Sequence, residues 1–267
     1  MKKISRRSFL AAAAVSAAAL ALTACGGASS SVASSAASSA AASSSASGSL
    51  ATVVAGKLTM ATNATFPPYE MTTDAGTIEG IDVDTAQAIA EKLGLELQID
   101  DMDFDAALLS VQQGKADIAM AGITVTDERM AVMSFSDSYA TGIQSVIVPE
   151  GSDITSVDDL AGKKIGTQRG TTGYLYCSDD FGEDAVVAYD NGLTAVQALN
   201  NGQVDAVVID NEPAKAYVES NPGLKILDTS YAEEDYAIGM AKGNTALLEA
   251  VNSALEELKA DGTLHVD

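Results

Sequence analysis

The chain has 267 residues and a formal net charge of −22 at pH 7, from 15 Lys and Arg against 37 Asp and Glu. Its length is that of one or two domains with a substantial hydrophobic core. A surface this acidic repels nucleic-acid phosphates and anionic lipid head groups, which excludes nucleic-acid binding and electrostatic docking to membranes. The only histidine is His265, so catalysis by a histidine is nearly excluded as well.

The first 24 residues have the features of a bacterial export signal. Four Lys and Arg residues lie within the first seven positions, and a mostly Ala and Leu run follows over residues 9–22. That run is shorter than the ~20 apolar residues of a membrane-spanning helix, so we expect a cleaved signal peptide at 1–24. The sequence Leu22-Thr23-Ala24-Cys25 resembles the lipobox of bacterial lipoproteins, which predicts lipidation of Cys25. The alternative is an ordinary secretory cleavage site.

Residues 25–51 are interpreted as a linker. From residue 26 to 49 the chain is almost wholly Ser, Ala and Gly, with no apolar periodicity that could form a core. We expect a flexible tether that holds a folded part at the outer face of the cytoplasmic membrane, in the periplasm or at the cell surface, by the lipid anchor only. With Cys25 lipidated, Cys177 has no disulfide partner and is expected to be a small core or surface residue.

From residue 57 the sequence alternates between short apolar runs, typical of strands, and longer runs with helical periodicity. This alternation predicts an α/β fold. The expected strands are 57–61, 95–99, 117–121, 164–167, 186–189, 206–209, 224–227 and 236–240. The expected helices are 81–94, 104–113, one after Gly173, and 245–260.

A short internal repeat divides this part of the chain in two. A helix is expected to end at Gly114 and again at Gly202, and each time an Asp three residues later begins a strand. The repeat suggests two lobes, each an α/β unit with a mainly parallel sheet. Ligands of open α/β sheets bind beyond the carboxyl ends of the strands. The ends that form the candidate site are expected at 62–63, 122–124, 168–170 and 210–211.

One segment resembles the signature of a known family. Residues 80–93 are similar to the signature of the family 3 extracellular solute-binding proteins, the amino-acid receptors of ABC importers, although Thr85 replaces the usual aliphatic residue. The similarity covers nearly all of residues 57–262. It continues through 61–70, 121–129, 135–137, 165–173 and 204–210.

The resemblance implies a two-lobed periplasmic-binding-protein-like fold of type II, with the lobes joined by two extended hinge strands. We expect the crossings near 139–144 and 234–237. Lobe 1 is then 52–140 plus 236–267, and lobe 2 is 141–235. The resemblance also implies a monomer without a cofactor, which captures a free amino acid by hinge closure and presents it to ABC permease subunits.

The resemblance assigns the charged groups of the ligand to Arg129 and Asp210. Arg129 carries a planar fork of N–H donors that suits a carboxylate. The matching family residue binds the ligand α-carboxylate, helped by the positions of Gly122, Thr124 and Thr172. Asp210 matches the residue that holds the α-amino group. Without the family, pairing with Asp127 or Glu128 on a helix surface is the favoured explanation of Arg129. Capping of a helix explains Asp210 equally well.

The remaining candidates surround the ligand side chain. Phe66 and Phe104 resemble the aromatic residues that enclose it, although Phe104 alone is equally typical of a core. Gln168 and Thr171 lie on a turn of lobe 2 whose backbone N–H groups can face an anion. Asn63 stands where relatives that prefer basic or amide side chains often have an acid, and an amide does not neutralise a buried ammonium. We therefore expect a polar amino acid rather than a strongly basic one.

The acidic clusters are interpreted as solvated surface. Residues 101–105 begin like a calcium loop, but Ala106 replaces the required Gly. Glu233, Glu234 and Asp235 most simply form a solvated face. The sequence offers no His and Cys set for a metal and no nucleophile–base pair. It predicts a binding protein, and the alternative is an exported enzyme on the same scaffold, similar to cyclohexadienyl dehydratase.

Overall fold

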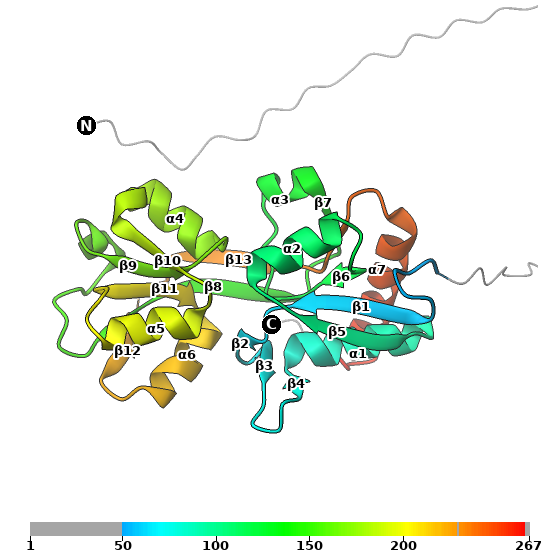
Figure 1. The fold of residues 1–267 in the computed structure, drawn as a ribbon, viewed down its shortest axis with the longest axis horizontal. Helices are drawn as coiled ribbons and strands as arrows, with labels where there is room; N and C mark the ends of the chain where they lie inside the picture. Colours follow the sequence, from blue (N-terminus) through cyan, green and yellow to red (C-terminus); the bar gives the residue numbers. More distant parts are fainter. Residues whose placement is uncertain (1–49, 229, 265–267) are drawn as a thin grey trace, which may run out of the picture. The chain divides into compact units, whose positions relative to one another are not determined.

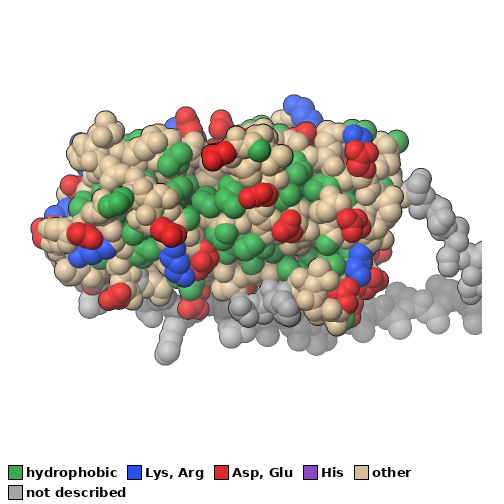
Figure 2. Space-filling view, turned by 90° about the horizontal axis from the view of Figure 1, so that it is seen from below, with side chains coloured by type: hydrophobic (Ala, Val, Ile, Leu, Met, Phe, Trp, Pro, Cys, Tyr) green, Lys and Arg blue, Asp and Glu red, His purple; other side chains and the backbone are tan. Residues whose placement is uncertain are grey.

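The computed structural model describes residues 50–228 and 230–264, which form two α/β lobes, each built around its own sheet (Figure 1). The predicted signal peptide, Cys25, His265 and all but the last two residues of the predicted linker lie outside the described residues. Within the described ranges, no helix is both long and apolar enough to cross a membrane. On the face shown in Figure 2, carboxylates are spread over the surface, with fewer Lys and Arg among them.

Lobe 1 contains a mixed five-stranded sheet in the order β5-β1-β6-β14-β7. Alternate side chains of β1 face opposite helical layers, because Leu58 and Met60 belong to the apolar cluster of α1 and α7, and Ala61 to the cluster of α2. Its strands are β1 (Lys57–Thr62), β5 (Glu96–Asp101), β6 (Ile118–Ala119), β7 (Met133–Phe135) and β14 (Gly239–Ala241). Its helices are α1 (Ile81–Leu93), α2 (Phe104–Gln112), α3 (Asp127–Val132) and α7 (Thr245–Ala260).

Three short strands between β1 and α1 form a small separate sheet. They are β2 (Thr65–Phe66), β3 (Glu70–Thr72) and β4 (Ile78–Glu79). This sheet packs closely against the start of α1. Gly80 has φ of 140°, and a Cβ at this position would lie 2.2 Å from the carbonyl oxygen of Tyr69, so glycine is required there.

Lobe 2 contains a six-stranded sheet, ordered β10-β9-β11-β8-β12, with β13 also paired to β8. Helix α4 packs on one face of this sheet, and α5 and α6 pack on the other. Cys177 lies buried in the core on the α4 side. The strands are β8 (Ala140–Pro149), β9 (Ile165–Gln168), β10 (Val186–Tyr189), β11 (Ala206–Asp210), β12 (Leu224–Ile226) and β13 (Ala232–Tyr236). The helices are η1 (Val157–Leu160), α4 (Thr172–Phe181), η2 (Glu183–Ala185), α5 (Gly192–Asn200) and α6 (Asn211–Ser220).

Two antiparallel strands, β8 and β13, connect the lobes (Figure 1). Their register runs from Ala140 opposite Tyr236 to Gln144 opposite Ala232. Tyr236 ends β13, and β14 of the other sheet begins at Gly239. The predicted single strand 236–240 is therefore wrong. This run is apolar throughout because it is buried where the chain passes from one sheet to the other, and not because it forms one strand.

The prediction of mainly parallel sheets is also wrong. In lobe 1, β1 is parallel to β5 and β6, but β14 is antiparallel to β6 and β7. In lobe 2, β9 is parallel to β10 and β11, but β8 is antiparallel to β11, β12 and β13. The chain enters β8 and β14 from the other lobe. These two strands therefore do not belong to a strand–helix–strand unit, which would make them parallel to their neighbours.

The internal repeat has a structural counterpart in both lobes. Asp117 accepts hydrogen bonds from the backbone N–H groups of Thr59 and Val53, each at 2.8 Å. In lobe 2, Asp205 accepts from the N–H of Lys164, also at 2.8 Å. Each Asp lies just before a strand, β6 or β11, and links it to the neighbouring segment at β1 or before β9.

Candidate functional site

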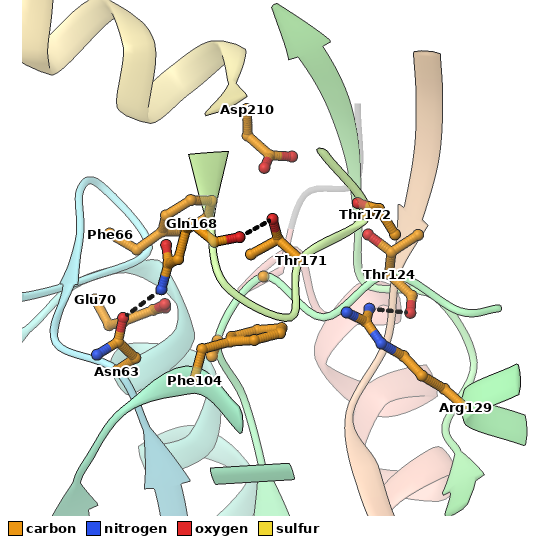
Figure 3. A pocket seen from close by; sticks show the side chains of 12 residues that line it. Asn63, Phe66, Glu70, Phe104, Thr124, Arg129, Gln168, Thr171, Thr172 and Asp210 are labelled. Carbon is orange, nitrogen blue, oxygen red and sulfur yellow. Dashed lines mark hydrogen bonds between the residues drawn. The ribbon is translucent and has the colours of Figure 1, made fainter. Parts of the chain in front are cut away.

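A small cavity lies between the two lobes (Figure 3). It occupies the carboxyl ends of β1, β9 and β11, where the strand pattern placed the candidate site. All ten sequence-predicted site residues line it, together with Glu70 and Ala121. The ten are Asn63, Phe66, Phe104, Gly122, Thr124, Arg129, Gln168, Thr171, Thr172 and Asp210.

The lobes are closed over this cavity. The side-chain amide of Gln168 in lobe 2 donates to Asn63 Oδ1 in lobe 1 at 2.9 Å. Arg129 Nη2 in lobe 1 donates to the carbonyl oxygen of Gly170 in lobe 2 at 3.1 Å. Gly170 has φ of 74°, and a Cβ there would lie 1.7 Å from Asp105 Oδ1 of lobe 1. A side chain at position 170 would therefore displace Asp105 when the lobes are this close, and the left-handed backbone also favours glycine.

Arg129 is held with its guanidinium inside the cavity. It lies in the first turn of α3, where the hydroxyl of Thr126 accepts from its backbone N–H at 3.2 Å. Its Nη1 donates to the carbonyl oxygen of Thr124 at 2.8 Å, and its guanidinium carbon lies 5.3 Å from the centre of the Phe104 ring. Within the described ranges Arg129 forms no salt bridge, so it does not pair with its acidic helix neighbours.

The environment of Arg129 favours an anionic partner. The residue is only 9% exposed, and this burial lowers the pKa of its guanidinium, while the carboxylate of Glu234 acts in the opposite direction. An Arg side chain nevertheless stays charged in proteins. A buried charge needs a partner, because desolvation is costly without one. The N-terminus of α4, whose cap is Thr171, borders the same cavity and offers backbone N–H groups to an anion.

Asp210 lies across the cavity at the end of β11 (Figure 3). It occupies the position before α6, but its side chain makes no capping hydrogen bond. Its carboxylate instead accepts from Gln144 Nε2 at 2.8 Å and from the hydroxyl of Tyr236. Burial raises the pKa of Asp210 to about 7, with the nearby Glu234 as the second cause. An ammonium group would stabilise the ionised form of such an acid.

Glu70 lines the cavity and was not among the predicted site residues. It is fully buried beside the carboxyl group of Asp82, and no N–H or O–H of another described residue donates to its two oxygens. Burial raises the pKa of Glu70 well above its usual range, and Asp82 adds to the effect. The signal was present, because Glu70 ends the segment 61–70 that resembles the family. It was missed because β2 and β3 are too short to show a strand pattern.

Asp82 is hydrogen-bonded to the backbone of Gly122, one of the residues that line the cavity. Asp82 lies in the first turn of α1, where no side chain makes a capping hydrogen bond. Asp82 is instead fully buried and accepts from the backbone N–H of Gly122 at 3.1 Å and from the hydroxyl of Tyr139 at 2.9 Å. Burial raises the pKa of Asp82 to about 6. Asp82 thus positions the backbone at Gly122.

The interpretation of Glu234 as solvated surface is wrong. Only 6% of Glu234 is exposed, and its Oε2 accepts from Thr124 Oγ1 and Gln144 Nε2, both at 3.0 Å. Its neighbours Glu233 and Asp235 are exposed as expected. Side chains alternate along β13, with Glu234 and Tyr236 buried, but three consecutive acidic residues show no such alternation in the sequence. Among the described residues, no cluster of three acidic, His or Cys side chains is arranged to hold a metal ion.

A family profile and two named relatives each match most of this chain. The profile of the family described as bacterial extracellular solute-binding proteins, family 3, matches residues 58–266. A probable histidine-binding protein of Neisseria gonorrhoeae is 34% identical over 76% of this chain and 78% of its own length. A putative ABC transporter arginine-binding protein 2 of Escherichia coli K12 is 33% identical over 80% of this chain and 90% of its own.

The fold is similar to that of a solved structure. An ancestral arginine-binding protein bound to arginine superposes with a TM-score of 0.75 and is 44% identical, over 78% of this chain and 94% of that one. This similarity confirms the predicted two-lobed fold of type II.

Proposed function

The chain belongs to the bacterial extracellular solute-binding proteins of family 3, and we propose that it captures a free amino acid between its lobes and delivers it to the permease of an ABC importer. Members of this family act outside the cytoplasm. The chain is a binding protein and not an enzyme, because its relatives are binding proteins by name. No observation favours the alternative of an exported dehydratase.

One observation carries the proposal: the cavity holds a guanidinium on one side and carboxylates on the other. An α-amino acid is a zwitterion, so its two charged groups match the two sides. We assign the α-carboxylate to Arg129, with Gly122, Thr124 and Thr172 beside it. We assign the α-ammonium group to Asp210.

The ligand side chain is proposed to lie among Asn63, Phe66, Phe104, Gln168 and Glu70. The sequence favoured a polar over a strongly basic ligand because Asn63 carries no charge. Glu70 lines the same cavity and supplies the negative charge that Asn63 lacks. We therefore propose a side chain that ends in N–H donors, with arginine ahead of glutamine. The names of the relatives, which include histidine-binding and arginine-binding proteins, support this order.

The remaining organisation is also proposed. We place lobe 1 at 52–140 plus 236–267 and lobe 2 at 141–235, which puts the boundaries in the strands β8 and β13. We propose that lipid on Cys25 anchors a monomer to the outer face of the membrane. A Cys25→Ala chain should then move from the membrane fraction to the soluble fraction of the producing cells. Light scattering during size exclusion should give the mass of one chain.

Calorimetry with each of the twenty amino acids tests the function. We expect saturable heat with a subset that includes arginine, and mass spectrometry should recover the bound amino acid unchanged. Absence of binding to any of them would refute amino-acid capture. Appearance of a product would instead favour the enzyme.

A further inference from the structure

One amide group bridges two buried carboxylates at the hinge. Nε2 of Gln144, on strand β8, donates to Asp210 Oδ2 at 2.8 Å and to Glu234 Oε2 at 3.0 Å. All three side chains are buried. Gln144 and Glu234 belong to the two strands that cross between the lobes, so the bridge lies within the hinge itself.

The bridge continues into lobe 1. The hydroxyl of Thr124 donates to Glu234 Oε2 at 3.0 Å, and the carbonyl oxygen of the same Thr124 accepts from Arg129 Nη1 at 2.8 Å. A continuous chain of contacts therefore runs from Arg129 through Thr124, Glu234 and Gln144 to Asp210. It joins the two sides of the cavity by way of the hinge and not through the space left for a ligand.

We propose that Glu234 is a positioning residue of the amino-acid site, which holds Gln144 against Asp210 and ties this assembly to Thr124 of the opposite lobe. The inference rests on the proposed function, because it takes Asp210 as the partner of the ligand ammonium. Glu234 does not line the cavity, so it acts on the ligand through its neighbours. One of its oxygens, Oε1, has no hydrogen-bond partner among the described residues.

Glu234 also sets the charge of the site. Burial raises the pKa of Asp210 to about 7, and the nearby carboxylate of Glu234 adds to this effect because it disfavours the ionised form of Asp210. On the other side, the same carboxylate favours the charged form of Arg129. The titratable groups that act on Asp210 from the surrounding elements are Glu234 and Tyr236 of β13, Arg129 of α3, Tyr176 of α4, Glu70 of β3, and Tyr69 before β3.

This arrangement predicts how binding depends on pH. An ammonium group pairs with ionised Asp210, so affinity should fall below the pKa of that acid, by about tenfold per pH unit. Removing the charge of Glu234 should lower the pKa of Asp210 by roughly one unit. The loss of affinity should then begin at a correspondingly lower pH.

The test compares Glu234→Gln with Glu233→Gln on the same strand. Gln keeps an oxygen that can accept from Thr124 and Gln144, so the fold is preserved, and Glu233 is exposed. The ratio of the Kd values for L-arginine at pH 5.5 and pH 8 is measured by calorimetry. We expect this ratio to be several-fold to about tenfold smaller in Glu234→Gln than in wild type and in Glu233→Gln. Equal ratios in all three proteins would overturn the proposal.

A second measurement does not need a ligand. The carbon-13 resonance of the Asp210 carboxyl group, identified by its absence from Asp210→Asn, is titrated in the ligand-free proteins. Its midpoint should lie near 7 in wild type and about one unit lower in Glu234→Gln. If wild type binds no amino acid, the proposed function fails, and this titration still decides the role of Glu234. An unchanged midpoint in Glu234→Gln would contradict it.

Discussion

The two sides of the cavity handle charge in different ways. On one side, Arg129 already donates to two backbone carbonyls, those of Thr124 and Gly170. On the other side, no N–H or O–H of another described residue donates to the carboxylate oxygens of Glu70, and Asp210 shares its amide donor with a second acid. The bond to Thr124, within lobe 1, orients the cation, whereas the acids can still accept hydrogen bonds from donors that a ligand brings.

The acids on and beside this side of the cavity favour their protonated forms. Burial raises the pKa of Asp82 to about 6 and that of Asp210 to about 7, and it raises the pKa of Glu70 well above its usual range. A cationic group of the ligand can replace these protons. Under the proposed ligand assignment, the acidic side would set the selectivity between amino acids, and Arg129 would bind the α-carboxylate that they share.

The largest expected effect comes from removing the basic side. Arg129→Ala should weaken amino-acid binding by about 2–5 kcal/mol, because the ligand carboxylate would be buried without its partner. Arg169→Ala is the control, since its side chain is 57% exposed. Calorimetry with L-arginine should show a rise in Kd of about thirtyfold or more for Arg129→Ala and no rise for Arg169→Ala. Wild-type affinity in that variant would remove Arg129 from the site.

The acidic side should separate one ligand from another. Glu70→Gln should weaken binding of L-arginine by about 1.5–3 kcal/mol, since a charged hydrogen bond is replaced by a neutral one. Binding of L-glutamine should change much less. Glu79→Gln, at an exposed position of neighbouring β4, should affect neither ligand. An equal loss for arginine and glutamine would show that Glu70 acts on the fold and not on selectivity.

The ligand-free protein should become less stable as the pH rises from 5.5 to 8. The folded-state pKa values of Asp82 and Asp210 lie above those of the unfolded chain, so their contribution is greatest below the unfolded values and is lost through about pH 6 to 7. Each kcal/mol lost should lower Tm by about 2–4 °C.

Asp210→Asn should flatten this decline in thermal melts, whereas Asp190→Asn, at an exposed position, should leave it unchanged. A melting temperature that rises with pH in the wild type would contradict the raised pKa values of Asp82 and Asp210 in the folded protein.

The smallest effect concerns closure itself. Gly170→Ala should weaken binding by roughly tenfold, because the new Cβ would meet Asp105 only when the lobes are together. The double variant Gly170→Ala with Asp105→Ala should recover most of the affinity. The strain of a left-handed backbone with a side chain at position 170 remains in both proteins, so recovery isolates the contact between lobes. Failure to recover would assign the whole effect to backbone strain.

Much of the fold and the outline of the site could be predicted from the sequence. The helix 245–260 and the strand 186–189 were expected with the bounds that the structure has. The strand ends and the family resemblance together named ten residues that line one cavity. The elements and the strand ends could be located because long periodic segments and strand ends carry local signals.

Glu70 and Glu234 could not be predicted in the same way. Strand β3 has three residues, too few to show a period, and β13 is acidic, so neither resembles a buried strand. The burial of both carboxylates comes from contacts between segments far apart in sequence, such as the contact of Glu234 with Thr124. The mixed direction of the sheets was missed for a similar reason, since it follows from where the chain crosses between the lobes.

The bond between Asp117 and the backbone of Val53 has a mechanical consequence. The chain enters the described structure at residue 50, in lobe 1 beside β1 and β6. A force applied on the N-terminal side would therefore act on lobe 1 and not on the hinge strands. In the proposed hinge closure, lobe 2 would then move relative to the anchored lobe 1. A sensor built from this protein should be immobilised through its N-terminal side and carry its reporter dye on lobe 2, where the full displacement on closure would be recorded.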